Sequence, residues 1–159
     1  MAKPLIFTER ELAFLRELCR QKVEFLIVGL SAATLQGTPA VTQDIDLWFS
    51  DLDQPGLRKA LKKVGGVFVS ATAFSPPRLV GDAVELFDIV THMHGLRSFA
   101  EEAAAAVPVL LGGVKIKVLP LERIIASKEA LNRPKDQRVL AVLKDSLAAA
   151  SKQRKPRQR

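Results

Sequence analysis

The chain has 159 residues, of which 48% are hydrophobic and 26% charged, as expected for one globular domain that buries a core. No apolar run is long enough to cross a membrane, and the N-terminus lacks the pattern of a secretory signal. The single cysteine, Cys19, excludes an internal disulfide framework, and its apolar surroundings predict an inert thiol. These features predict a cytoplasmic protein.

The net charge of +7 is concentrated at the C-terminus. Residues 151–159 contain five cations and no acid, so the rest of the chain carries only +2. We therefore expect one domain in residues 1–150 and a basic, disordered tail in residues 151–159. Such a tail either contacts a polyanion such as nucleic acid or is simply solvated.

The first half of the chain alternates between helical and extended patterns. Thr8 followed by Glu11 is a capping box, and leucines at helical spacing continue this helix to about residue 21. Short apolar runs predict three strands, over residues 25–28, 44–49 and 67–69. Glycines and prolines delimit two further helices, over residues 31–35 and 54–64.

The second half contains a strand, a hairpin and three helices. After a proline-containing loop, apolar residues predict a strand over 84–90 and a helix over 98–106. Gly112-Gly113 joins two apolar runs as a hairpin, over 107–111 and 114–118. Prolines begin the last two helices, over 120–131 and 134–149. This order of elements predicts an α/β or α+β domain with a mixed central sheet.

Three aspartates are the main candidates for chemistry. Asp44 and Asp46 are separated by one residue in a predicted strand, so both side chains point to one face. Two carboxylates there are costly unless a cation compensates them, and such oxygen ligands suit Mg²⁺. Asp88 lies in a similar strand, and if the two strands are neighbours the three carboxylates converge to hold metal or accept a proton. The alternative for Asp44 and Asp46 is that both are solvated at the edge of the strand. The alternative for Asp88 is that it caps a helix or forms an ion pair in a loop.

A glycine stands where the first strand gives way to a helix. Gly29 permits close approach of a ligand, and the helix start offers free N–H groups to an anion. The Ser31 hydroxyl could donate a hydrogen bond to a phosphate oxygen. The alternative is an ordinary turn at the end of a strand.

Two histidines and two aromatic residues lie next to the aspartate strands. His92 and His94 have a spacing found in metal sites, but a zinc site is not expected because there is no third histidine. A role in a loop or gate near the site is the expected alternative. Trp48 and Phe49 are expected to pack at the core or rim, with stacking on a base as the alternative for Trp48.

Together these residues resemble the signature of the DNA polymerase β-like nucleotidyltransferase superfamily. That signature is an apolar strand, a glycine followed by Gly or Ser, a spacer, and two acids separated by one residue. Here thirteen residues separate Leu30 from Asp44, and Asp88 matches the later third carboxylate. The form Thr42-x-Asp44-x-Asp46 is similar to that of small bacterial nucleotidyltransferases related to AbiEii toxins and to minimal nucleotidyltransferases.

Those relatives often carry a later lysine and an Arg-x-Lys-Asp motif on C-terminal helices. Lys128 and the run Arg133-Pro134-Lys135-Asp136 match this arrangement. The alternative for the two lysines is that they are solvated and do not contact phosphate. The alternative for Arg133 and Asp136 is that they cap the junction of the last two helices. The resemblance covers residues 23–143, most of the chain.

The resemblance implies a nucleotidyltransferase-like mixed sheet flanked by helices, with helices at the C-terminus. It implies transfer of a nucleoside monophosphate from an NTP to an acceptor hydroxyl of a protein, a tRNA or a small molecule, assisted by Mg²⁺ or Mn²⁺. The expected catalytic and metal-binding residues are Asp44, Asp46 and Asp88. The expected nucleotide contacts are Gly29, Ser31, Thr42, Lys128 and Lys135.

One residue departs from the family pattern. Leu30 stands where many relatives have a second glycine, and this favours the alternative of a catalytically weak or inactive member that binds nucleotide, RNA or a partner protein. Either form could act in a toxin–antitoxin system. Because the C-terminal helices leave little room for a substrate domain, a homodimer or a partner protein could complete the acceptor pocket.

Overall fold

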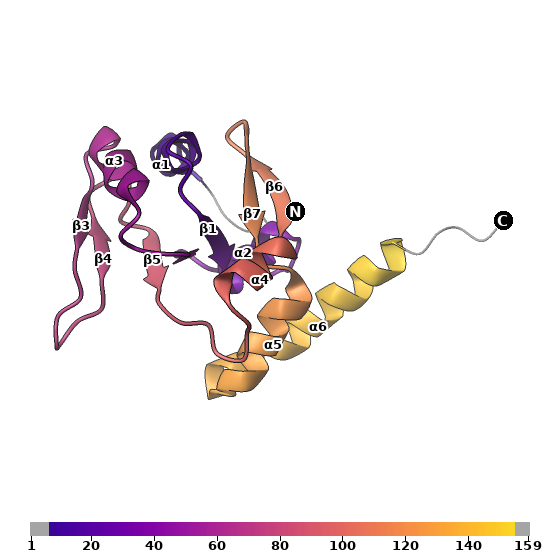
Figure 1. Cartoon of the computed structure of the whole chain (residues 1–159). Helices are drawn as coiled ribbons and strands as arrows, with labels where there is room; N and C mark the ends of the chain where they lie inside the picture. The colour runs from indigo at the N-terminus through magenta and orange to yellow at the C-terminus, as the bar shows by residue number, and fades with distance from the viewer. Residues whose placement is uncertain (1–6, 155–159) are drawn as a thin grey trace.

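The computed structural model describes residues 7–154, and its central sheet has five strands (Figure 1). Along the chain these are β1 (Phe25–Val28), β2 (Ile45–Phe49), β5 (Phe87–Val90), β6 (Val107–Leu111) and β7 (Val114–Val118). Their order in space is β5–β2–β1–β7–β6. The β1–β2 and β6–β7 pairs are antiparallel, whereas β1–β7 and β2–β5 are parallel. The sheet is therefore mixed, which confirms the predicted architecture.

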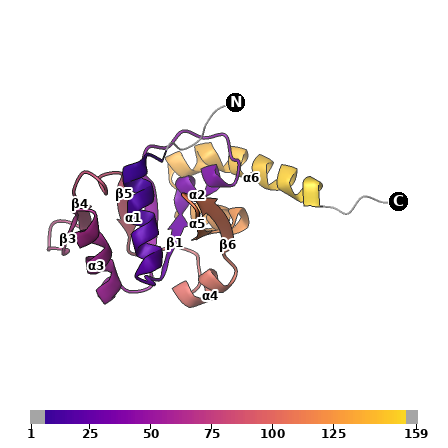
Figure 2. The same ribbon diagram turned by 90° about the horizontal axis from the view of Figure 1, so that it is seen from above.

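Within residues 7–154, six helices surround the strands. They are α1 (Glu9–Arg20), α2 (Gly29–Leu35), α3 (Pro55–Lys63), α4 (Phe99–Ala104), α5 (Leu121–Leu131) and α6 (Pro134–Arg154). Figures 1 and 2 show α1 beside α3 on one side of the sheet and α5 beside α6 on the other, and contacts within each pair support this view. The sheet is thus covered on both sides.

Two short strands form a separate ribbon. They are β3 (Val67–Val69) and β4 (Arg78–Val80), which pair antiparallel, and β4 also contacts β5 at the edge of the main sheet. The sequence pattern predicted β3 but not β4, because Arg78–Val80 is only three residues long and follows two prolines. The ribbon gives β5 a neighbour on its outer side.

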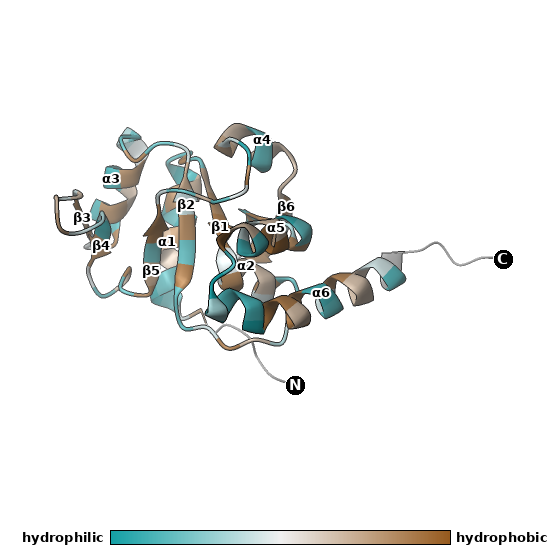
Figure 3. Cartoon of the chain, turned by 90° about the horizontal axis from the view of Figure 1, so that it is seen from below, coloured by the Kyte–Doolittle hydropathy of each residue, from teal (hydrophilic) through white to brown (hydrophobic). Residues whose placement is uncertain are grey.

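The hydrophobic core lies between the sheet and the helices. All four residues of β1 are buried, and Leu15 and Leu18 of α1 are fully buried as well. Phe14 of α1 meets Phe87 of β5 edge-on, with ring centroids 5.1 Å apart. Figure 3 shows the hydrophobic residues in brown along the strands, and hydrophilic residues in teal on α3 and at the start of α6. This core fixes the relative positions of β1, β2 and β5, which carry the candidate site.

Most predicted elements are present, but several boundaries differ. The second strand begins at Ile45 and leaves Asp44 outside it, and β5 begins at Phe87 rather than at residue 84. Two turns, closed by hydrogen bonds from Val84 to Gly81 and from Phe87 to Val84, occupy the missing part of β5. Helix α2 begins earlier than predicted, at Gly29.

The C-terminal prediction is wrong in part. Helix α6 continues through Arg154, so residues 151–154 are helical and do not belong to a disordered tail. Residues 155–159, the remainder of the predicted tail, lie outside the described residues. Within residues 7–154, no helix is both long enough and apolar enough to span a membrane.

Candidate active site

Asp46 and Asp88 lie opposite each other on neighbouring strands. In the parallel pairing of β2 with β5, the partner of Asp46 is Asp88. Paired residues of adjacent strands are about 4.8 Å apart and project their side chains to the same face. The condition on which convergence depended, that the two aspartate strands are neighbours, is therefore met, and it brings these two carboxylates together.

Asp44 occupies a different position from the predicted one. It precedes β2, is exposed, and its backbone carbonyl accepts a hydrogen bond from the Thr42 hydroxyl at 3.2 Å. The alternation of side chains along a strand therefore does not place Asp44 beside Asp46. Asp44 is nevertheless near enough to raise the pKa of both Asp46 and Asp88. It stands at the margin of the carboxylate pair.

Gly29 allows the close approach of β1 to the Asp46 carboxylate. Its φ is +65°, and a Cβ atom at this position would lie 2.5 Å from Asp46 Oδ2. Any other residue would be strained by this φ and would displace the carboxylate. The glycine predicted to face a ligand therefore faces, first of all, a catalytic candidate of its own chain.

Ser31 supports Asp46 through the backbone. Its hydroxyl is fully buried, donates to the Val28 carbonyl at 2.7 Å and accepts from the Asp46 amide at 3.1 Å. A hydroxyl has one proton to donate, and here the Val28 carbonyl accepts it. The prediction that Ser31 donates to a phosphate is therefore wrong for this structure, and Ser31 instead joins β1, α2 and β2.

The electrostatics of Asp46 reflect an excess of negative charge. Burial and the nearby carboxylate of Asp88 raise its pKa from 3.8 to about 6, and Asp44 adds to this effect, whereas Lys128 and Lys135 oppose it. Burial and Asp44 also raise the pKa of Asp88. Among the described residues, none makes an ion pair with Asp46 or Asp88. The site therefore favours binding of a cation.

A cleft of about 470 Å³ opens beside Asp46, within the range of small-molecule sites. One wall is the end of β5 with the segment that follows it, and the other is α5 with the start of α6. Four predicted site residues line it, namely Gly29, Asp46, Lys128 and Lys135. Asp44, Asp88, Thr42 and Ser31 are not among its lining residues.

The junction of α5 and α6 holds cations at the cleft. Asp136 is fully buried and accepts hydrogen bonds from Arg133 Nε at 2.6 Å and Nη2 at 3.0 Å. It also lies 3.4 Å from Lys128 Nζ and accepts the Arg133 amide, which caps α6. These bonds, chiefly from Arg133, lower the pKa of Asp136 to about 2. The capping role is confirmed, and it directs Lys128 and Arg133 toward the cleft.

The histidine pair forms part of the opposite wall. His92 and His94 both line the cleft, and their rings meet edge-on with centroids 4.6 Å apart. Gly95 fixes this segment to α5, because a Cβ atom there would lie 2.5 Å from Ala130 Cβ. The buried Ser127 of α5 also lines the cleft. Sequence reasoning missed Ser127, whose only signal is its place beside Lys128.

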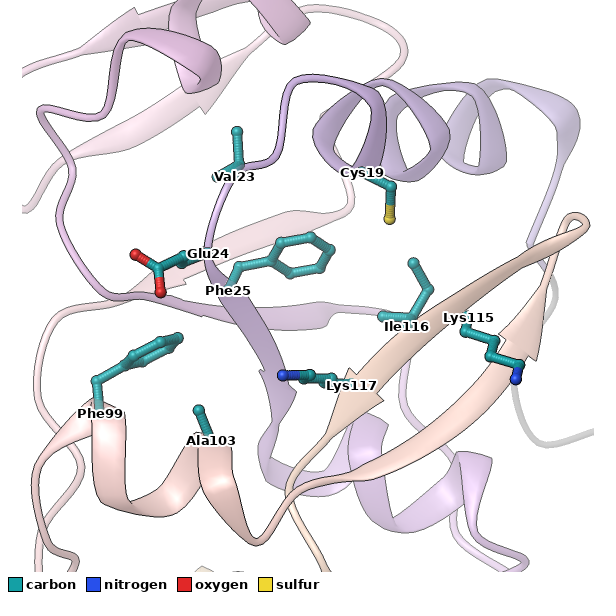
Figure 4. Close-up of a pocket in the computed structure, with 9 residues that line it drawn as sticks. All are labelled: Cys19, Val23, Glu24, Phe25, Phe99, Ala103, Lys115, Ile116 and Lys117. Carbon is teal, nitrogen blue, oxygen red and sulfur yellow. The ribbon is translucent and has the colours of Figure 1, made fainter.

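Trp48 and Cys19 have structural environments. Trp48 is 8% exposed and meets Phe99 edge-on at 5.2 Å, which confirms packing and leaves no face for a base. Figure 4 shows Cys19 in a second pocket, of about 260 Å³, between α1, β1, β7 and α4. Burial raises the pKa of the Cys19 thiol, as expected for an inert cysteine. None of the predicted catalytic or nucleotide-binding residues lines this second pocket.

The carboxylates fit a divalent cation that is shared with a substrate. In the described part of the chain, no group of three His, Cys, Asp or Glu side chains is arranged to hold a metal. Mg²⁺, however, often takes only one or two carboxylates and completes its shell with water and substrate phosphates. The paired Asp46 and Asp88, which make no ion pair with any cation in the described part of the chain, provide that donor set.

The mixed sheet, its strand order and its flanking helices together define a nucleotidyltransferase-like fold. Two solved structures of ANT(2'')-Ia share it. A solution structure of this antibiotic-resistance factor superimposes with a TM-score of 0.60 and 18% identity, covering 89% of this chain and 85% of that one. A crystal structure of ANT(2'')-Ia in complex with adenylyl-2''-tobramycin superimposes with a TM-score of 0.57 and 17% identity, covering 87% of this chain and 88% of that one. At these identities the likeness establishes the fold.

The sequence itself adds no closer relationship. No protein-family model matches it, and no curated protein matches it.

Proposed function

We propose that the protein transfers a nucleoside monophosphate from an NTP to an acceptor hydroxyl and releases pyrophosphate, with Mg²⁺ or Mn²⁺. The observation that carries this proposal is the register pairing of Asp46 with Asp88 beside a cleft whose far wall presents Lys128 and Lys135. The Asp46 carboxylate on one side of the cleft, with Asp88 paired beside it, and the cations on the other side complement a metal-bound triphosphate. The nucleotidyltransferase-like fold supports the same reaction class.

Each group has a chemical role in this reaction. Asp46 and Asp88 hold the divalent cation, which supplies charge stabilisation at the phosphoryl oxygens when it is bound. Lys128, Arg133 and Lys135 neutralise phosphate charge from the α5–α6 side. Asp88, at the exposed edge of the pair, orients the acceptor hydroxyl or accepts its proton.

The alternative is a member that binds nucleotide without transferring it, which the departure at Leu30 favours. The leucine side chain, however, is partly buried against the core, and Leu30 is not among the residues that line the cleft. The adjacent Gly29 is the residue that lines it. The position of Leu30 therefore gives the alternative no structural support.

The test is transfer of label from each NTP, labelled at its α-phosphate, to tRNA or protein acceptors in the presence of Mg²⁺. We expect metal-dependent transfer by the wild-type chain and a loss of roughly 1,000-fold in Asp46→Asn, since metal stabilisation is worth several kcal/mol. Asp82→Asn is a matched control, because Asp82 is exposed and makes no ion pair with a described residue. Nucleotide binding without any transfer would favour the alternative.

A further inference from the structure

A second charged region lies apart from the cleft. Residues 54–81, which form α3, β3 and β4 and are called here the α3–β4 unit, contain five cations and no acid. All five are exposed, and none of them makes an ion pair with a described residue. The five are Arg58, Lys59, Lys62, Lys63 and Arg78. This unit concentrates positive charge that the +2 balance of residues 1–150 does not suggest.

The same unit exposes apolar side chains. Phe74 is 98% exposed, Val67 59% and Val80 45%, and these are three of the five large hydrophobic residues exposed in residues 7–154. Val67 and Val80 are paired across the ribbon, so they share its outer face. The buried Leu79 and the half-buried Phe68 occupy the inner face. Val67 and Val80 together on one face of the ribbon, and Phe74 in the loop that joins its strands, are apolar side chains available to a partner.

Phe74 is presented by an ordered turn. The Thr72 hydroxyl accepts hydrogen bonds from the amides of Phe74 at 3.2 Å and Ser75 at 3.0 Å. The Thr72 amide donates to the Ser75 carbonyl at 2.9 Å, which closes the turn. Because the backbone of this turn is ordered, only the side chain of Phe74 has to lose conformational freedom when a partner stacks on it.

The charges and the aromatic ring follow one another along the unit. Figure 1 shows the tip of the β3–β4 ribbon, which contains Phe74, at the opposite end of the unit from α3, which carries most of the cations. Arg78 pairs with Val69 in the ribbon between them. A small anion could contact one part only, whereas a flexible polyanion could follow the whole unit.

We infer that the α3–β4 unit binds single-stranded nucleic acid. Cations that track a phosphate backbone, combined with an aromatic side chain on which a base stacks, are the features that such binding requires. The unit adjoins β5, which carries Asp88, through β4. A nucleic acid bound here is a candidate acceptor for nucleotidyl transfer, and this point alone rests on the proposed function.

The test uses the full chain and a fluorescent oligouridine RNA of roughly 16 nucleotides, with anisotropy measured over a salt series. Lys59→Ala with Lys63→Ala removes two cations from one face of α3. This variant should bind more weakly and reduce the slope of log affinity against log salt by about 1.4, or about 0.7 for each lost phosphate contact. Phe74→Ala should weaken binding by about 5- to 150-fold and leave the slope unchanged.

The matched control is Lys115→Ala with Lys117→Ala, which lowers the net charge equally and changes two exposed lysines of β7. Equal weakening by this control would overturn the inference in favour of unspecific charge attraction. Unchanged affinity in Phe74→Ala would also overturn it, as would binding to anionic vesicles without binding to RNA. None of these binding results depends on label transfer, so a failure here is distinguishable from a failure of the proposed reaction.

Discussion

Replacing Asp46 with asparagine should stabilise the protein at alkaline pH while abolishing its proposed activity. The folded structure raises the pKa of Asp46 from 3.8 to about 6, chiefly through burial and the Asp88 carboxylate. A difference of this size corresponds to about 3 kcal/mol between the protonated and ionised forms. Ionised Asp46 therefore lowers the free energy of unfolding by about this amount, and asparagine cannot ionise.

The sign of the pH dependence follows from the raised pKa. The stability linked to the protonated carboxyl is fully present below about pH 4 and is lost as the pH rises through about 6. The gain from Asp46→Asn should thus be small near pH 4 and reach about 3 kcal/mol near pH 8. Loss of activity with gain of stability is the expected compromise at a functional site.

Urea unfolding followed by circular dichroism, with a chelator present, measures this difference at both pH values. Asp82→Asn is the control, because Asp82 is exposed and does not belong to the Asp46–Asp88 pair. The reasoning would be refuted if Asp46→Asn changed stability equally at both pH values, or if it destabilised the protein near pH 8.

Three further predictions concern the same site. Gly29→Ala should lower the free energy of unfolding by about 1 to 2 kcal/mol through its φ of +65°, and it should also displace the Asp46 carboxylate. Gly65→Ala is the control, because its φ is +74° but its Cβ atom would meet nothing within 4 Å, so it carries the backbone cost alone. Urea unfolding and transfer assays compare the two variants, and equal transfer activity in both would contradict the close approach of Gly29 to Asp46. Mg²⁺ should raise the thermal unfolding midpoint of the wild type near pH 8 but not of Asp46→Asn, and an equal rise would contradict the metal assignment. Asp136→Asn should lower the unfolding free energy by about 2 to 3 kcal/mol near pH 7, because it removes charged hydrogen bonds from Arg133; an unchanged urea midpoint would contradict this.

The sequence was sufficient to predict the five strands of the central sheet and the mixed character of that sheet, but not the order of the strands in it. The apolar run of β1 and the glycine pair between β6 and β7 are local signals, and both produced the expected elements. The sequence singled out Asp46 and Asp88 because a carboxylate in an apolar strand is otherwise costly, but it left open whether their strands are neighbours, and the structure supplies that pairing. Local patterns predicted the strands because each strand depends on residues close together in the chain, whereas the Asp46–Asp88 pairing joins residues 42 positions apart.

Other features depend on contacts between distant segments. Asp44 looked equivalent to Asp46, but the pairing of β2 with β5 starts one residue later and leaves Asp44 exposed. The hydroxyl of Ser31 looked available for phosphate, yet the Val28 carbonyl accepts its proton. The bidentate contact of Arg123 with the buried Glu102, which joins α5 to α4, had no signal because 21 positions separate the two residues. Such contacts become visible only in the folded chain.

The central claim is that Asp46 and the cations of the cleft together form a metal–nucleotide site. Calorimetric titration of an NTP analogue that cannot be transferred, with and without Mg²⁺, tests it most directly. For the wild type, Mg²⁺ should tighten binding by at least about tenfold, or about 1.4 kcal/mol. In Asp46→Asn this enhancement should disappear, while Asp82→Asn should retain it. An enhancement of equal size in Asp46→Asn would contradict the assignment of the site.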